Sequence, residues 1–310
     1  MNALRVRSPG LLATVQDLGR PGHAALGVPP CGAMDPLSLR AGNRLVGNGD
    51  HAAAVECTLT GFEFETLADV AIAVTGDASG ITVEAHGAAR SIAPWAPHAI
   101  PAGVAVKVGR TEAGCRAYLC IAGGLDTTVS LASRATHITA GLGAAPLKAG
   151  DVLRIGNGAR TPPGATHDAA AALRAMVVPG VLRVIDLGVH SGLFSRDFSV
   201  SSRSDRAGVR LREAIADGGG TTLVSRGMFW GAVQVPPDGS PVILGPDGPT
   251  TGGYELAAAV IEADLPRLGQ SRPFAPIRFV AVTREQARDA LREQRALLDR
   301  VAPEARRGKD

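Results

Sequence analysis

The feature that most restricts the fold of this chain is a series of short apolar runs that glycine and proline interrupt. The chain has 39 glycines and 21 prolines among its 310 residues, and runs such as VAIAVT at 70–75 and VIL at 242–244 stand between them. This pattern is typical of short strands, rich in valine and isoleucine, that are joined by tight turns. The sequence therefore predicts a mainly β fold with a few helices.

The same pattern gives the individual elements. Candidate strands are residues 4–6, 70–75, 81–85, 105–108, 117–122, 152–155, 181–186, 222–224, 232–235, 242–244 and 278–282. Helices are expected at 35–46, at 254–265 and from about 284 to 301. Asp35 before Pro36 fits an N-cap followed by proline at the first helical position, and Thr283 with Gln286 fits a capping box.

A stretch of glycine, proline and small residues at 157–172 shows no strand pattern, whereas both flanking regions do. Such a composition is typical of a linker. The sequence predicts an N-terminal subdomain over 1–160, a C-terminal subdomain over 173–282 and a C-terminal helix over 283–301. The alternative is one continuous β-rich domain with a surface insertion at 157–172.

A loop of Thr250, Thr251, Gly252 and Gly253 follows an apolar strand, and we expect it to open the helix at 254–265. The first N–H groups of a helix have no intrahelical partner, and glycine lets a ligand approach them closely. These four residues are therefore candidates for binding a carboxylate, carbamoyl or phosphate group of a substrate. The alternative is that the glycines make a turn and a threonine caps the helix. The spacing of a Walker nucleotide site is absent from the loop.

Composition argues against several classes of function. The formal net charge of +3 comes from 32 basic and 29 acidic residues, and no basic stretch is interleaved with aromatic residues, so we expect no nucleic-acid partner. No apolar run reaches the roughly 20 residues that cross a bilayer, and the amino terminus lacks a signal pattern, so we expect no membrane partner and a cytoplasmic protein. The cysteines and histidines show no metal-ligand spacing, so no metal site is predicted.

Ordered motifs along nearly the whole chain resemble one family. They are residues 14–22, 27–35, 43–48 with Glu56, 122–124, 133–134, 147–151, Arg206 with Gly208 and residues 210–211, and residues 231–254. In this order they resemble the carboxyltransferase family that contains allophanate hydrolase subunit 2, the Kip-antagonist protein and the C subunit of 5-oxoprolinase. The second half of the carboxyltransferase domain of urea carboxylase belongs to the same family.

The resemblance implies two cyclophilin-like β-barrel subdomains that pack together. It also implies a subunit of a multi-chain ATP-dependent 5-oxoprolinase, which acts with a Kip-inhibitor-like B subunit and an A subunit on a small anionic amide. One alternative is half of a biotin-dependent carboxyltransferase for urea or another amide, and another is a non-catalytic antagonist that binds a kinase inhibitor. No cofactor is expected to be covalently bound: ATP would be used by the complex, and biotin would arrive on another chain.

Several positions depart from the family pattern. Cys31 stands where serine is usual, Asp205 where asparagine is usual, residues 207–209 where Met-Gly-Tyr is usual, Arg226 where glutamate is usual and Pro249 where glutamine is usual. Most of these are polar positions near the predicted site. They bear on substrate and activity rather than on the fold.

An enzyme that acts on a lactam or urea needs a cation for an anionic group and a carboxylate that moves a proton. By residue type and context the catalytic candidates are Asp17, Arg20, Arg206 and Asp247, and Gln234 is a further substrate-binding candidate because it faces away from the valines beside it. The alternative for Asp17 and Arg20 is that they pair with each other across their own turn. The alternative for Arg206 is a solvated basic edge.

Overall fold

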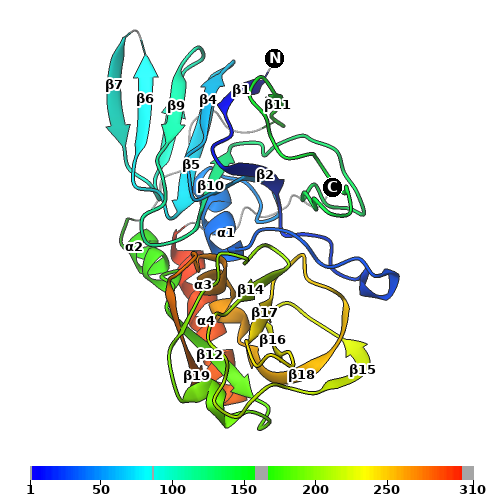
Figure 1. The fold of residues 1–310 in the computed structure, drawn as a ribbon. Coiled ribbons are helices and arrows are strands. Elements are labelled where there is room, and N and C mark those ends of the chain that lie inside the picture. Colours follow the sequence, from blue (N-terminus) through cyan, green and yellow to red (C-terminus); the bar gives the residue numbers. More distant parts are fainter. Residues whose placement is uncertain (1, 86, 158–166, 302–310) are drawn as a thin grey trace.

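A mainly β architecture is confirmed by the computed structural model, which describes residues 2–85, 87–157 and 167–301. Its strands form three sheets, of six, five and eight strands. The first two sheets come from residues 2–157, called here the N-terminal half, and the third comes from residues 167–301, called the C-terminal half. In Figure 1 the N-terminal sheets lie above the C-terminal sheet, and helices α1 (Pro36–Leu45) and α3 (Leu265–Gly269) lie where the halves meet.

The N-terminal half consists of two antiparallel sheets that bury a common core. Phe64 and Val106 of one sheet and Ile72 and Leu119 of the other are fully buried in it. The six-stranded sheet has the order β11 (Val152–Arg154), β1 (Ala3–Ser8), β4 (Glu63–Thr66), β9 (Ala105–Val108), β6 (Ile81–Ala85) and β7 (Ala88–Ile92). The five-stranded sheet has the order β2 (Leu12–Gln16), β3 (Ala54–Thr58), β10 (Arg116–Ile121), β5 (Val70–Gly76) and β8 (Pro97–Ile100).

The C-terminal half is built on one curled sheet. Its order is β13 (Phe198–Ser199), β19 (Pro276–Ala281), β12 (Val181–Asp186), β18 (Thr251–Val260), β16 (Ala232–Val235), β17 (Val242–Leu244) and β14 (Gly208–Arg210), and β15 (Thr222–Gly227) pairs with β18. β12 and β19 are parallel, and the other pairs are antiparallel. Phe198 and Phe279 pack edge to face in its core, with ring centroids 5.8 Å apart.

The helices fasten the two halves together. α1 packs on β5 and β10, and the long helix α4 (Arg284–Val301) returns from the C-terminal half to contact α1 and α2 (His167–Met176). Leu298 and Val301 of α4 join the apolar cluster of α1, and Asp299 pairs with Arg44 at 2.6 Å. Short 3-10 turns lie at Ala24–Leu26, Ser191–Phe194 and Glu262–Asp264. Within the described part of the chain, no helix has the length and apolar character needed to cross a bilayer.

Two predicted helices and their caps are confirmed. Asp35 accepts a hydrogen bond from the Ser38 amide at 2.9 Å at the start of α1. At the start of α4, the Thr283 amide donates to Gln286 Oε1 at 2.8 Å and the Gln286 amide donates to Thr283 Oγ1 at 3.2 Å. These bonds satisfy N–H groups that the helix itself leaves unpaired.

The predicted helix at 254–265 is wrong. Strand β18 occupies Thr251–Val260, and helical structure begins only with the 3-10 turn at Glu262–Asp264 and with α3. The alanines at 257–259 favour a helix by intrinsic propensity. Pairing with β12 on one side and with β16 and β15 on the other satisfies the backbone of β18 as a strand, and this tertiary pairing outweighs propensity.

Some elements were not predicted from the sequence. These are strands β2, β3, β4, β7, β8, β13 and β14 and helices α2 and α3. Charged residues interrupt the apolar pattern in two of the strands, ECT in β3 and EFET in β4. Helix α2 overlaps the stretch at 157–172 that was expected to be a linker, and residues 158–166 of that stretch lie outside the described residues. The subdomain bounds 1–160, 173–282 and 283–301 stay predictions.

A substitution at Gly269, at the end of α3, tests the contact between the halves. A Cβ at this position would lie 2.1 Å from the carbonyl oxygen of Met34 in the N-terminal half. Gly269→Ala should therefore lower the free energy of unfolding by about 2 kcal/mol, because backbone has to move to admit the methyl group. Urea unfolding measures the change. Gly49→Ala is the matched control, since nothing lies within 4 Å of a Cβ there, and an equal loss in both variants would contradict the prediction.

Candidate active site

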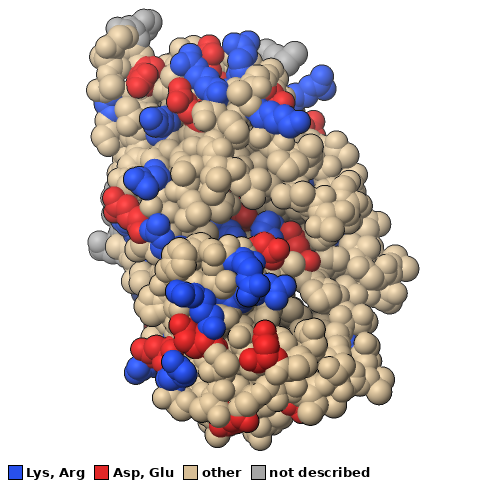
Figure 2. Space-filling model, in the orientation of Figure 1, with Lys and Arg blue, Asp and Glu red and all other residues tan. Residues whose placement is uncertain are grey.

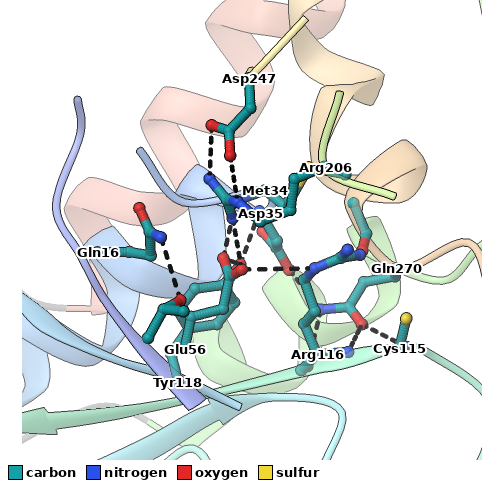
Figure 3. Close-up of polar contacts among 12 residues, drawn as sticks. Gln16, Met34, Asp35, Glu56, Cys115, Arg116, Tyr118, Arg206, Asp247 and Gln270 are labelled. Carbon is teal, nitrogen blue, oxygen red and sulfur yellow. Dashed lines mark hydrogen bonds and ion pairs between the residues drawn. The ribbon is translucent and has the colours of Figure 1, made fainter. Parts of the chain in front are cut away.

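A buried network of ion pairs crosses from one half of the chain to the other (Figure 3). Arg206 lies before β14, and its Nη1 donates to Oε1 of Glu56 on β3 at 2.6 Å. Its Nε and Nη2 donate to the two carboxylate oxygens of Asp247 at 2.8 and 3.1 Å. Nη2 also donates to the carbonyl oxygen of Gly32 at 2.5 Å. The structure thus brings together the predicted residues Arg206 and Asp247.

Glu56 is placed by the alternation of its strand. Its neighbours Val55 and Cys57 point into the core between the N-terminal sheets, so Glu56 points to the opposite face. There its Oε2 accepts hydrogen bonds from the Tyr118 hydroxyl at 2.7 Å and from the Met34 amide at 2.9 Å. Tyr118 is the residue directly opposite on β10. Both carboxylate oxygens of this buried side chain therefore have partners, as a buried charge requires.

The network keeps its charges in spite of burial. Burial alone would raise the pKa of Glu56, but the guanidinium groups of Arg206 and Arg116 hold it below its ordinary value. Burial alone would likewise lower the pKa of Arg206, but the carboxylates of Glu56 and Asp247 raise it. Burial, with the charge of Glu56 beside it, raises the pKa of the Tyr118 hydroxyl well above its ordinary value. We conclude that Glu56 and Arg206 are both ionised at neutral pH and that Tyr118 is a neutral donor.

A second contact between the halves lies next to this network. Gln270 follows α3, and its side-chain Nε2 donates to Asp35 Oδ2 at 2.8 Å. Its side-chain Oε1 accepts from the backbone amides of Cys115 and Arg116 at 3.0 and 2.9 Å. Arg116 Nη1 donates to the carbonyl oxygen of Gly269. Burial raises the pKa of Asp35 to about 6, although its hydrogen bonds with Gln270 and Ser38 oppose this shift.

A cavity of about 480 Å³, called here the central cavity, opens beside the network. Its walls come from both halves, with Thr58, Arg116 and Thr139 on the N-terminal side and Asp205, Arg206 and Asp247 among those on the C-terminal side. Figure 2 shows a hollow between the halves where basic and acidic side chains meet. A carboxylate that is held at a cavity wall by an arginine can accept or orient a proton of a bound ligand. This cavity is therefore the candidate active site.

Asp17 and Arg20 are buried, but neither lines the central cavity. Asp17 accepts from the Gly19 amide, the Ser133 hydroxyl and the Arg134 amide, each at 2.7 Å. Arg20 donates to the carbonyl oxygens of Ala135 at 2.5 Å and Ser130 at 3.2 Å. Both side chains thus hold their loop against residues 130–135, and these contacts replace the pairing of Asp17 with Arg20 that the sequence offered as an alternative.

The helix on which the predicted anion site at 250–253 depends does not begin there. Thr251, Gly252 and Gly253 belong to β18, and Gly252 is paired with Arg226 of β15. Gln234 of β16 is buried, donates to Met228 Sδ at 3.3 Å, and lies against Gly252. These residues and Thr250 are absent from the lining of the central cavity. The structure therefore does not place them at the wall of this cavity.

Sequence reasoning missed Glu56, Arg116, Tyr118 and Gln270 as members of the site. A signal was available for Glu56, because a carboxylate in the middle of the otherwise apolar run AVECT is rarely buried without a partner. Arg116 and Gln270 carry no local signal. They meet only because α3 packs against the start of β10.

Comparison with known proteins gives consistent matches. The family model of the carboxyltransferase domain, subdomain A and B, matches residues 26–281. The C subunit of 5-oxoprolinase from Escherichia coli is 34% identical over 310 residues, which cover 96% of this chain and 97% of that protein. The Haemophilus influenzae protein of the same name is 32% identical, over 93% of this chain and 94% of its own length. The urea amidolyase of Lachancea kluyveri is 33% identical over 96% of this chain, but over only 18% of its own length.

Solved structures agree with these matches. The crystal structure of Kluyveromyces lactis urea amidolyase superposes with a TM-score of 0.83 at 28% identity, and that of the urea carboxylase from the same organism with a TM-score of 0.84 at 28% identity. Each covers 99% of this chain. The chain spans 20% of the first protein and 30% of the second, so the similarity concerns one part of these larger proteins.

Removing one charge from the network should destabilise the fold. Glu56→Gln keeps the shape of the side chain but leaves Arg206 without its charged partner on β3, so we expect a loss of about 3 kcal/mol in the free energy of unfolding. Glu65→Gln is the matched control, because Glu65 pairs with Arg5 and Arg7 at the surface at 3.4 and 3.5 Å. We expect at most about 0.5 kcal/mol there. Urea unfolding measures both changes. Similar losses in the two variants would show that the buried network stabilises the fold no more than a surface ion pair does.

The Glu56 contribution should also depend on pH in a defined direction. The folded protein lowers the pKa of Glu56 below its ordinary value of 4.5, so the carboxylate stabilises the fold above that value. This stability is lost as the pH falls through the lowered pKa. The difference in unfolding free energy between the wild type and Glu56→Gln should therefore stay constant from about pH 7 to about pH 5 and then shrink. Urea titrations at several pH values would reject this account if the difference grew on acidification.

Proposed function

This chain belongs to the family of the carboxyltransferase domain, subdomain A and B, and from that membership we propose that it is a subunit of a multi-chain, ATP-dependent 5-oxoprolinase. The complex would open 5-oxo-L-proline to glutamate. Support comes from the two bacterial relatives named as the C subunit of 5-oxoprolinase, with which the similarity extends over nearly the whole length of both chains. The relatives establish a role in an enzyme complex, and the particular reaction is our proposal.

The observation that carries the proposal is the carboxylate of Asp247 at the wall of the central cavity. Arg206 contacts both of its oxygens, so its orientation is fixed before a substrate arrives. Opening a lactam ring needs proton transfer to the ring nitrogen and to or from the attacking oxygen, and a positioned carboxylate can take part in either. We propose that Asp247 holds or moves this proton.

Arg206 takes a different role in this proposal from the one that the sequence suggested. Its Nε, Nη1 and Nη2 already contact Asp247, Glu56 and Gly32. We therefore assign it to positioning Asp247.

The names of the relatives support a role for partner chains. Both bacterial relatives are named as subunits, which supports partner chains in general. We propose a Kip-inhibitor-like B subunit and an A subunit as these partners, with ATP used by the complex and with the assembly in the cytoplasm.

A second candidate function is half of a biotin-dependent carboxyltransferase for urea or another amide. Its support is the match to urea amidolyase in both sequence and structure. In that case biotin would be delivered by another chain, and Asp247 would take a proton from the amide nitrogen that becomes carboxylated.

Glutamate release from 5-oxoproline and ATP by the complex of this chain with its A-type and B-type partners tests the main proposal. Asp247→Asn should lower kcat by about 100-fold or more, because the amide cannot exchange a proton as a carboxylate does. Asp238→Asn is the matched control, since Asp238 lies in the exposed turn before β17, where it accepts a hydrogen bond from the Ser240 amide. This control should leave kcat unchanged.

Two other outcomes would redirect the assignment. Unchanged turnover in an Asp247→Asn complex would remove Asp247 from the chemistry. A well-formed complex that releases no glutamate would contradict the main proposal. Carboxylation of urea on addition of a biotin carrier and bicarbonate would then establish the second candidate.

A further inference from the structure

We propose that Cys31, His137 and Asp247 form a binding site for one divalent cation of the zinc type. One ligand atom from each side chain, a thiol sulfur, an imidazole nitrogen and a carboxylate oxygen, lies within 4.8 Å of the other two. All three are largely buried: Cys31 is 1% exposed, His137 is 8% exposed, and the side chain of Asp247 is 9% exposed. The three residues come from separate segments, so no spacing in the sequence reveals the group.

The distances suit a shared ion. Zinc binds sulfur at about 2.3 Å and nitrogen or oxygen at about 2.0–2.2 Å in a tetrahedron, which places neighbouring ligand atoms roughly 3–4 Å apart. The three ligand atoms lie within 4.8 Å of one another, so small side-chain shifts would bring them to this separation. In the described part of the chain no hydrogen bond joins any two of these side chains.

The backbone holds Cys31 in this position. Its φ angle is 56°, in the left-handed region that residues other than glycine seldom adopt. Its amide donates to the carbonyl oxygen of Pro246 at 2.9 Å, immediately before Asp247. This bond fastens the loop of Cys31 to the loop of Asp247, and it brings a thiol from the N-terminal half beside a carboxylate from the C-terminal half. A strained residue that its surroundings hold in place is often found at a functional site.

Two arginines stand where supporting groups of a metal site are found. Arg20 lies beside the Cys31 thiol, and Arg206 lies beside Asp247. Arg20 is 2% exposed, and its Nη1 has no hydrogen-bond partner among the described residues. A metal-bound thiolate would give this nitrogen an acceptor, just as Asp247 already accepts from Arg206. Such outer hydrogen bonds orient the ligands of metal sites.

His137 needs one local change to act as a ligand. The Ala140 amide donates to His137 Nδ1 at 2.9 Å, so this nitrogen carries a lone pair and no proton. Ala140 is exposed, and its amide can bond to water when a metal takes a ring nitrogen. The exchange costs one partly buried hydrogen bond.

The set of donors indicates the class of cation. One thiolate, one imidazole and one carboxylate suit Zn²⁺ better than the oxygen-preferring Mg²⁺ or Ca²⁺. Three protein ligands leave a fourth position for water or a ligand oxygen, as in catalytic rather than structural zinc sites. Because Asp247 lines the central cavity, the cation would lie at the cavity wall.

Titration of the chelator-treated, dialysed protein with Co²⁺ tests the site directly. We expect about one equivalent bound per chain, a near-ultraviolet charge-transfer band from the cobalt–thiolate bond, and loss of this band when Zn²⁺ displaces Co²⁺. Cys31→Ser should abolish the band and weaken Zn²⁺ binding at least tenfold, on the order of the effects seen when metal sites lose a supporting group. His137→Gln should weaken Zn²⁺ binding by a similar factor.

Matched controls separate this site from adventitious binding. Cys115→Ser and His190→Gln alter a buried thiol and a buried imidazole outside the cluster, and both should bind Co²⁺ as the wild type does. Absence of the band in the folded wild-type protein would overturn the proposal whether or not a variant folds. Persistence of the band in Cys31→Ser would also overturn it. The readout is metal binding, so its outcome is independent of whether the complex hydrolyses 5-oxoproline.

Discussion

The buried ion pair between Arg206 and Glu56 is the interaction on which the arrangement of this protein depends. The two residues are 150 positions apart, and they come from the two halves of the chain. Two charges taken out of water are costly unless every donor and acceptor has a partner. Tyr118 and the Met34 amide complete the partners of Glu56, and Asp247 completes those of Arg206. The halves are therefore held in one relative position, because any other would leave charges buried without partners.

The same network shapes the candidate active site. A guanidinium whose donors are already taken cannot also bind a substrate as its main partner, so Arg206 acts on the chemistry through Asp247. Asp247 contacts Arg206 directly and also lines the central cavity. Its carboxylate also lies within 4.8 Å of ligand atoms of Cys31 and His137. The loop of Asp247, in the C-terminal half, thus helps to form a cavity whose other wall comes from the N-terminal half. The candidate active site therefore belongs to the junction and to neither half alone.

The errors in the prediction have a common cause. Residues 254–260 contain alanines that favour a helix locally, yet strand partners on both sides make them the centre of a sheet. The assignment of Thr250–Gly253 to anion binding relied in part on that helix, and this part of the argument is lost with it. Asp17 and Arg20 were predicted as catalytic candidates, with pairing across their own turn as the alternative, but their partners at residues 130–135 lie more than 100 positions away.

The sequence by itself determined the mainly β class, most of the longer apolar strands, helices α1 and α4 with their caps, and the family. These features depend on local patterns of apolar residues, turn residues and helix caps, and on motifs in a fixed order, all of which are readable along the chain. The tertiary structure alone decided that Glu56 meets Arg206, that Gln270 meets Asp35, and that Cys31, His137 and Asp247 converge. Such contacts join residues from distant segments, and only the packing of sheets and helices brings those segments close together.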